Sequence, residues 1–330
     1  MADQRIIALD GLRGVAIACV MLGHFGPESL KGAGAFGVLL FFALSGRLMA
    51  DVLFIGGLNW REFAIRRLAR LYPAMLFFLG CMFLVLPLLG RSDLLSDWWT
   101  YPTFTVNLMV VAANRFPPFD HLWSVSVEVQ TYVVLALIAV SVPDRKRPMA
   151  LLAGALFCFG NGLARTYLLH QGGFLVYWRP DVAAASVFAA AFLRLILKDV
   201  RLPSWAPPAV FIVALSLLLA SRQPWITLTA NGLLLAFVGA TAERSATAAC
   251  RILETRPMVF LGTISYSLYI WQQLFKYAYE GSLPRSVAVL LSLAIAAFSY
   301  YRVERPGKEA ILAAWQRHGA RNKSTMTSQH

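Results

Sequence analysis

Charged residues are scarce in this chain. Asp, Glu, Lys and Arg together make up 14% of its 330 residues, whereas 58% are hydrophobic, and the mean hydropathy is +0.61. Soluble domains carry about 25% charged and roughly 45–50% apolar residues. A soluble domain of this size could not bury so much apolar surface, but a lipid bilayer can accommodate it. Because no long polar stretch separates the apolar blocks, we expect a single polytopic membrane domain.

Cysteine pairs and sequence repeats are also missing. The four cysteines, Cys19, Cys81, Cys158 and Cys250, are scattered through or beside apolar segments, and no C-x-x-C motif occurs. This pattern gives no indication of a disulfide framework, a zinc site or any other metal site. No internal repeat of fixed period is found, which counts against the repeat architecture of many secondary transporters.

The apolar segments predict an all-α integral membrane protein, a bundle of about ten transmembrane helices. They lie at 6–24, 36–56, 73–90, 122–142, 149–164, 182–197, 207–221, 225–241, 257–275 and 285–301. Each is close to the length that a bilayer requires, whereas 103–113 is too short to span and is expected to be re-entrant or interfacial. The first segment carries Asp10 and Arg13 and lacks a small-residue cleavage site, so we do not expect a cleaved signal peptide.

Positive charge is distributed asymmetrically along the chain. The formal net charge is +13, with 30 Lys and Arg residues. With a cytoplasmic N-terminus, 19 of the 30 lie in cytoplasmic segments, eight lie on the opposite side and three (Arg13, Arg47 and Arg194) lie within helices. The positive-inside rule therefore predicts both termini in the cytoplasm. We attribute the basic excess to this topology and to anionic lipid headgroups, and we expect no nucleic acid partner.

Polar residues at membrane depth are costly, so they are the candidates for function. The first helix contains Asp10, Arg13 and His24. A separation of eleven residues places Arg13 and His24 on one helix face, about 16 Å apart along the axis. A functional pair is one interpretation. The alternative is an Asp10–Arg13 ion pair that neutralises itself, together with an interfacial histidine.

A basic run, REFAIRRLARLYP at 61–73, contains Arg66, Arg67 and Arg70. We expect it on the cytoplasmic side, with the third membrane helix beginning near Pro73. Guanidinium groups bind phosphate oxygens in a bidentate manner, so this run could form a phosphate site. A positive-inside anchor is the alternative interpretation.

Two further segments carry polar residues inside apolar stretches. In HLWSVSVEVQTY (121–132), one helix face carries His121, Ser124, Val125, Glu128 and Tyr132. A carboxylate at that depth must be paired, protonated or functional. A structural ion pair or interhelical hydrogen bond is the alternative. The second helix contains Ser45 and Arg47; Arg47 could pair with an aspartate at position 51, one turn away. Glycines upstream, at 32, 34 and 37, could let another helix approach closely.

Six blocks in order make the chain resemble the membrane-bound acyltransferase family 3. They are LDGLRGVAIACVMLGH (9–24), GAFGVLLFFALSG (34–46), FAIRRLARLYP (63–73), HLWSVSVEVQTY (121–132), ISYSLYIWQQ (264–273) and YRVERP (301–306). The resemblance extends over roughly residues 5–306. It implies a bacterial inner-membrane O-acyltransferase that moves an acyl group, usually acetyl, from acyl-CoA to a carbohydrate hydroxyl. The acceptors it implies include O-antigen, exopolysaccharide and lipid-linked oligosaccharide.

The resemblance also implies residue roles. The family's Arg-x10-His pair falls on Arg13 and His24, with His24 the expected catalytic base. Its Arg-x-x-Arg motif falls on Arg67 and Arg70, which with Arg66 are expected to bind the acyl-CoA co-substrate. Its membrane carboxylate falls on Glu128, which we expect to orient His24 or stabilise its protonated form. No bound cofactor is expected.

Two positions depart from the family pattern. Arg47 stands where many members have Phe or Tyr, and Gln272 stands where many have a histidine. The second departure concentrates the chemistry on His24. We expect a membrane domain at 1–306 and a basic, partly disordered cytoplasmic tail at 307–330, without the hydrolase-like domain fused to some relatives. The competing functions are a transporter or flippase of a lipid-linked sugar and an inactive assembly partner of polysaccharide synthesis.

Overall fold

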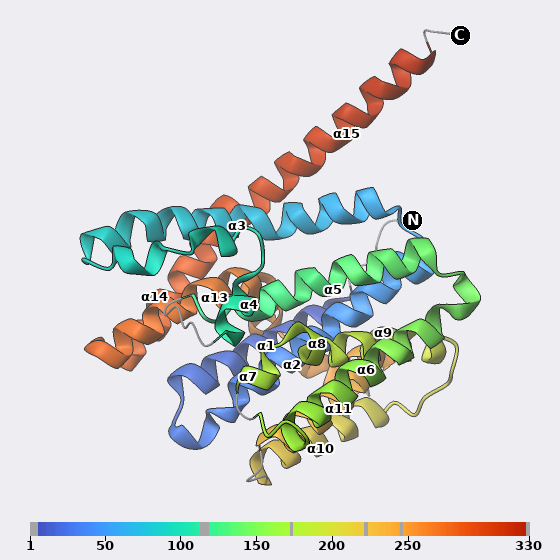
Figure 1. Ribbon diagram of the computed structural model, residues 1–330, viewed down its shortest axis with the longest axis horizontal. Helices are drawn as coiled ribbons and strands as arrows, with labels where there is room; N and C mark the ends of the chain where they lie inside the picture. Colours follow the sequence, from blue (N-terminus) through green and yellow to red (C-terminus); the bar gives the residue numbers. More distant parts are fainter. Residues whose placement is uncertain (1–5, 113–118, 172–173, 221–223, 245–246, 328–330) are drawn as a thin grey trace.

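The computed structural model describes residues 6–112, 119–171, 174–220, 224–244 and 247–327 (Figure 1). No strand occurs within these ranges, which confirms the all-α prediction. Seven helices among them are long and apolar enough to cross a membrane, and two shorter apolar helices accompany them. The chain is therefore a multi-pass membrane protein, while ten crossings and two cytoplasmic termini stay predictions.

The predicted segments coincide well with the observed helices, because each of the ten overlaps one of the longer elements. The longer helices are α1 (Ile7–Phe25), α2 (Gly32–Met49), α3 (Trp60–Leu88), α5 (Leu122–Ser141), α6 (Arg147–Tyr167), α9 (Ala185–Leu197), α10 (Ala206–Ala220), α11 (Pro224–Thr241), α13 (Arg256–Gly281), α14 (Arg285–Ser299) and α15 (Arg305–Thr327). The shorter ones are α4 (Val106–Val111), α7 (Phe174–Tyr177), α8 (Pro180–Ala183) and α12 (Thr247–Leu253).

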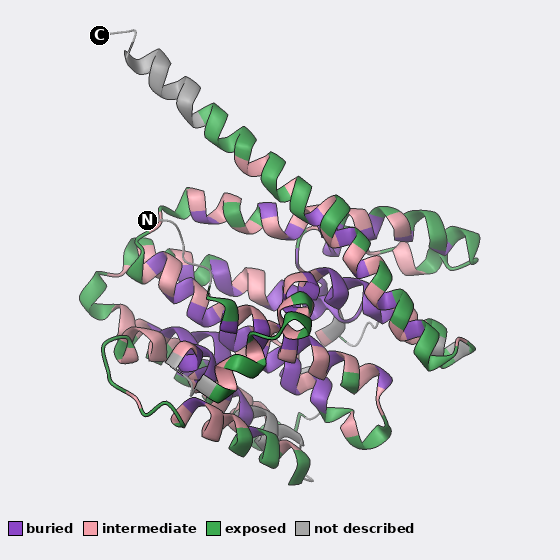
Figure 2. Cartoon of the chain, turned by 180° about the vertical axis from the view of Figure 1, so that it is seen from behind, coloured by how far each residue is buried: buried purple, intermediate pink, exposed green. Residues whose placement is uncertain are grey.

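The outer surface of the bundle is apolar. Leu84, Leu137, Phe157 and Leu290 are each 59% exposed or more, on four different helices. In water such a surface would drive aggregation or mark an interface, whereas in a bilayer it contacts lipid chains. Figure 2 shows the buried residues gathered at the centre of the bundle and the exposed ones along its periphery and on α15.

The centre of the bundle is formed where α1 packs against both α2 and α13. The helices approach closely at these crossings because glycine has no side chain. A Cβ added to Gly14 would overlap the carbonyl oxygen of Met258, and one added to Gly262 would overlap the carbonyl oxygen of Asp10. On the other face of α1, a Cβ on Gly37 would overlap the Ala16 carbonyl oxygen. The predicted close approach of a helix to the glycines of α2 is confirmed, and its partner is α1.

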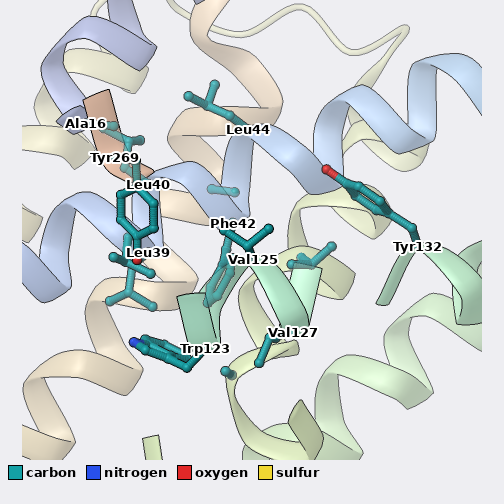
Figure 3. Packing of buried hydrophobic residues seen from close by; sticks show 14 of the residues in the cluster. Ala16, Leu39, Leu40, Phe42, Leu44, Trp123, Val125, Val127, Tyr132 and Tyr269 are labelled. Carbon is teal, nitrogen blue, oxygen red and sulfur yellow. The ribbon is translucent and has the colours of Figure 1, made fainter. Parts of the chain in front are cut away.

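Aromatic side chains fill the core beside these crossings (Figure 3). Phe42 of α2 packs edge-on against Trp123 of α5, with ring centroids 6.0 Å apart. Phe78 of α3 packs against Trp271 of α13 at 5.1 Å, again edge-on. Such pairs add about 0.5–1.5 kcal/mol each to the burial of the rings, so α2, α3, α5 and α13 are fixed around α1.

Two helices run into π-helical turns, which widen the backbone by one residue. The first, η2 (Ala50–Ile55), extends α2, and the second, η7 (Tyr300–Glu304), joins α14 to α15. Each turn carries one acidic residue toward the interior, Asp51 in the first and Glu304 in the second. Single π turns in α-helices occur frequently at functional sites.

The structure changes one expectation about the connections and adds detail to two others. Helix α3 begins at Trp60, capped by Asn59, so Pro73 lies inside it and the basic run is helical rather than a loop. The short segment 103–113 contains the six-residue helix α4, held to α5 by two 3.0 Å hydrogen bonds between Asn107 and Gln130. The helix α15 runs from Arg305 to Thr327, and the partly disordered tail expected at 307–330 stays a prediction.

Candidate active site

The ISYSLYIWQQ block of α13 connects polar residues from several other helices. The Tyr266 hydroxyl donates to the Leu71 carbonyl of α3 at 3.0 Å, and Ser267 donates to Glu304 at 2.7 Å. The Tyr269 hydroxyl donates to the His121 carbonyl at 2.8 Å, and Gln272 reaches His24 of α1. Because these groups satisfy one another, a polar block can lie in the core of an apolar bundle.

The candidate base, His24, lies in the last turn of α1. Its Nδ1 is 2.6 Å from the side-chain oxygen Oε1 of Gln272. The expectation that Glu128 orients this ring is wrong for the structure, since no hydrogen bond or ion pair joins the two among the described residues. Gln272, which sequence reasoning placed only as a departure from the family pattern, is the residue that holds the histidine.

A basic cluster lies at the other end of α1 and at the start of α3. Arg67 and Arg70 interact electrostatically with Arg13, and Lys308 of α15 lies within electrostatic range of both Arg67 and Arg70. The Arg67 guanidinium stands 5.6 Å from the ring centroid of Phe63, and its buried Nε has no hydrogen-bond partner in the described part of the chain. The sequence-predicted Arg13, Arg67 and Arg70 are thus brought together.

The ion pair of Asp10 with Arg13, the alternative weighed from the sequence, is also present at 3.1 Å. It does not remove Arg13 from the cluster, since Arg13 still interacts with Arg67 and Arg70. Neither Arg67 nor Arg70 forms an ion pair with a carboxylate in the described ranges. Placing like charges together without direct counter-ions is unfavourable in an apolar environment. The arrangement is therefore suited to an anionic ligand.

Glu128 lies between this cluster and α2. Its carboxylate accepts hydrogen bonds from the hydroxyls of Ser45 and Tyr132. It also interacts electrostatically with Arg67 and Arg70. Ser45 and Glu128, predicted separately on two helices, therefore share one site. Their position indicates a role in arranging the basic cluster rather than in orienting His24.

Arg47 belongs to a different site, a closed ionic network. Its guanidinium is 1% exposed and contacts Asp51 at 3.3 Å and Glu243. Arg194 of α9 binds the same two carboxylates, each at 2.6 Å. Burial alone would raise the pKa of Glu243, but the hydrogen bond from Arg47 and the charges of Arg47 and Arg194 lower it. The predicted Arg47–Asp51 pair is confirmed, and Arg47 contacts both carboxylates of the network, while its Nε and Nη2 have no hydrogen-bond partner among the described residues.

The remaining candidates occupy structural positions. His121 Nε2 lies 3.0 Å from the Ile270 carbonyl, and the Ser124 hydroxyl lies 2.7 Å from that of Tyr269, so both tie α5 to α13. Arg66 points away from Arg67 and Arg70 and pairs with Glu62 on the exposed face of α3. These contacts separate the three from the groups around His24 and Arg67.

The basic cluster has three further contributors, of which sequence reasoning singled out only Tyr132, on one helix face with Glu128. Tyr132 lies 5.8 Å beneath the Arg67 guanidinium, Glu304 lies within electrostatic range of Arg70, and Lys308 adds a cation from α15. The YRVERP block contained Glu304, so its acid at membrane depth was a usable signal. For Lys308 there was none, because it follows the block. In the ranges that the structure describes, no group of His, Cys, Asp or Glu could hold a metal ion.

The family comparison agrees with this geometry. Residues 6–301 match the acyltransferase domain of the acyltransferase 3 family, so the chain belongs to that family. It is similar to "Putative O-acetyltransferase SACOL0978" of Staphylococcus aureus (strain COL), at 26% identity over 355 residues, with 93% of this chain and 58% of the relative covered. It is also similar to "O-acetyltransferase OatA" of Staphylococcus aureus (strain NCTC 8325 / PS 47), at 25% identity over 349 residues, with 90% and 56% covered.

The chain spans somewhat more than half the length of these relatives. No solved structure matches it. The matched region contains the residues around His24 and the three arginines, whereas Lys308 lies beyond its last residue.

Proposed function

We propose that the chain is an O-acyltransferase that moves an acyl group, in the first instance acetyl, from acyl-CoA to a carbohydrate hydroxyl. The observation that carries the proposal is that a candidate base and a basic cluster lie at opposite ends of α1. His24 lies at one end, and Arg13, gathered with Arg67 and Arg70, lies at the other, about 16 Å away by helical rise. A phosphate-bearing donor and a base for the acceptor are the two things this reaction needs.

The donor would bind by its CoA phosphates at the basic cluster. Arginine suits this role because its planar fork donates two parallel hydrogen bonds to phosphate oxygens. The extended pantetheine would then run along α1 and bring the thioester to His24. Two arginines of the cluster, Arg67 and Arg70, have no ion-pair partner among the described residues, which suits a polyanionic ligand and supports acyl-CoA. An acceptor that is a lipid-linked glycan would approach from the other end.

The reaction requires a base and the exclusion of water. His24 would take the proton from the acceptor hydroxyl as its oxygen attacks the thioester carbonyl carbon. The C–S bond then breaks, the new ester forms, and CoA leaves as a thiol after the proton returns from the imidazolium to sulfur. Histidine suits this step because its ordinary pKa lies near neutrality. The surrounding apolar helices would keep water from hydrolysing the thioester.

Labelled acetyl-CoA supplied to membranes that contain the protein tests this function. We expect label to enter a glycan fraction, and His24→Ala to reduce incorporation about 10²–10⁴-fold at normal protein levels, since that is the usual contribution of a general base. His170→Ala, at an exposed histidine outside the site, is the matched control. Activity of a tenth or more of wild type in His24→Ala would reject the base assignment.

We further propose that the two ends of α1 face different compartments in a bacterial inner membrane. The 19 to 8 division of basic residues supports a cytoplasmic location of the basic cluster, where CoA is available. With the native cysteines removed, a cysteine at exposed Ser29, near His24, should react with an impermeant thiol reagent in intact cells. One at exposed Arg145 should react only after the membrane is opened. The reverse pattern would place the acceptor in the cytoplasm.

A further inference from the structure

The contact between Gln272 and His24 indicates which ring nitrogen carries the proton, given the orientation of the Gln272 amide. The atom of Gln272 that faces Nδ1, at 2.6 Å, is the carbonyl oxygen Oε1, which can only accept a hydrogen bond. Nδ1 must therefore be the protonated nitrogen of a neutral ring. In a neutral imidazole the other nitrogen, Nε2, then carries the lone pair.

The orientation of the Gln272 amide is itself determined by its surroundings. Its Nε2 group lies 3.5 Å from two acceptors, the Tyr269 carbonyl oxygen and Oε1 of Gln273. Turning the amide over would place its oxygen against these two oxygens and its NH₂ group against the His24 ring. Gln272 is also fully buried, so water cannot compensate for such a reversal.

The opposite edge of the His24 ring is left open by glycine. A Cβ added to Gly34, at the start of α2, would lie 3.8 Å from Nε2 and 3.9 Å from Cδ2 of the ring. Nothing in the described ranges hydrogen bonds to this Nε2, and the histidine as a whole is only half-buried. The lone pair of Nε2 is therefore not used by a hydrogen bond within the described ranges, so it can accept a proton.

We propose that Gln272 is a positioning residue that holds His24 in the Nδ1-protonated tautomer and presents Nε2 as the base. A neutral amide does this without the full negative charge that a carboxylate would bring. A carboxylate would stabilise the imidazolium, so the histidine would lose its neutral, basic form at a higher pH than it does beside an amide. The chain thus orients its histidine as a catalytic triad does, with an amide in the acid's place.

Nitrogen NMR on the full chain, labelled with ¹⁵N-histidine, tests the tautomer without relying on activity. The His24 signals are assigned by comparison with His24→Gln. We expect a protonated Nδ1 and an unprotonated Nε2 in the wild type, and a mixture of tautomers in Gln272→Leu. The opposite tautomer in the wild type, or an unchanged spectrum in Gln272→Leu, would overturn the proposal.

Kinetics test its consequence, which rests on the proposed acyl transfer. Gln272→Leu should lower kcat about 10–100-fold with little change in the KM for acetyl-CoA. Gln272→Glu should shift the acid limb of the kcat/KM profile to higher pH by about one unit, since the new carboxylate stabilises the imidazolium. Gln130→Glu, which places the same change on α5 away from the site, should leave the profile in place.

The two failures can be told apart. If membranes show no acyl transfer but the tautomer is as stated, the proposed function fails and the assignment of Gln272 stands. If transfer occurs and Gln272→Glu leaves the pH profile unmoved, the positioning role is wrong and the acyltransferase function stands.

Discussion

The two arginine sites of this protein differ in how their charges are balanced. In the network of Arg47, Asp51, Arg194 and Glu243, each cation contacts both carboxylates directly. In the basic cluster, Arg13 pairs with Asp10 at 3.1 Å, whereas no carboxylate lies within ion-pair distance of Arg67, Arg70 or Lys308 among the described residues. The nearby acids are occupied elsewhere, Glu128 with two hydroxyls and Glu304 with Ser267.

This difference separates structure from function. A buried ion pair with every partner present holds helices together, and breaking it leaves an uncompensated charge. Cations gathered without direct counter-ions destabilise the empty protein slightly and are compensated when an anion binds. Arginines of both sites lie in the membrane domain, so burial alone does not distinguish a structural arginine from a ligand-binding one. The presence or absence of a carboxylate within ion-pair distance does.

The largest expected effect is the loss of stability on removing Arg47. Arg47→Leu leaves Asp51 and Glu243 without one of their two cations in a buried site, which typically costs about 3–5 kcal/mol. Chemical unfolding of the purified protein in detergent measures the change. Arg66→Leu, which removes an exposed pair with Glu62, should cost no more than about 1 kcal/mol. Equal losses in the two variants would contradict the comparison.

In the basic cluster, the same kind of change should affect binding instead of stability. Arg67→Ala and Arg70→Ala should each weaken acetyl-CoA binding about 10–100-fold, because a hydrogen bond to a charged group contributes about 1.5–3 kcal/mol. Arg70→Lys should restore only part of the affinity, since lysine lacks the planar fork. Binding is measured by calorimetry at two ionic strengths, and added salt should weaken it.

Arg66→Ala is the matched control for these binding measurements, because it lies on the same turn of α3 and points to the exposed face. It should leave the affinity for acetyl-CoA unchanged, despite its adjacency to Arg67 in the sequence. A loss as large as that of Arg67→Ala would mean that the run acts only through its total charge.

The ionic network should also give stability a dependence on acid. The lowered pKa of Glu243 means that its contribution is complete above the ordinary glutamate range and is lost as the pH falls through the lowered value. Unfolding free energies of wild type and Glu243→Gln, measured between neutral pH and pH 3, should converge toward the acid end. A constant difference across that range would show that Glu243 contributes no charge-dependent stability.

The smallest effect is expected for Lys308. It is exposed at the edge of the basic cluster, so solvent screens its charge, and Lys308→Ala should weaken acetyl-CoA binding by only about threefold. Lys323→Ala, 15 residues further along the chain, is the control that removes the same charge. If both variants bind as wild type does, α15 adds nothing to the donor site.

Local patterns in the sequence predicted much of this molecule. Hydrophobic periodicity located the helices, and the spacing of Arg47 and Asp51 or of Asp10 and Arg13 predicted pairs that the structure contains. The glycines of α2 were correctly predicted to lie at a close helix contact. All these features depend on residues within one helix.

Contacts between residues of different helices could not be predicted from the sequence. Gln272 is 248 residues from His24, and Glu243 is 196 residues from Arg47, so no spacing rule connects them. The assignment of Glu128 to His24 went wrong for the same reason, since both are polar but His24 lies beside Gly34 and Glu128 beside Ser45, near opposite ends of α2. Likewise, Arg66 and Arg67 are adjacent in sequence, and only the packing of α3 decides which one turns inward.

The glycine crossings of α1 have a mechanical consequence. At Gly14 and Gly262 the backbones of α1 and α13 touch, so a slide of one residue would drive the Cβ of Val15 or Leu261 into a main chain that has no room for it. Helices joined in this way move as one body. An alternating-access transporter needs an interface between its two halves that can open, whereas α1 and α13 are in backbone contact at Gly14 and Gly262. In the proposed acyl transfer, both reactants would therefore move to α1 and α13 while these helices stay in place.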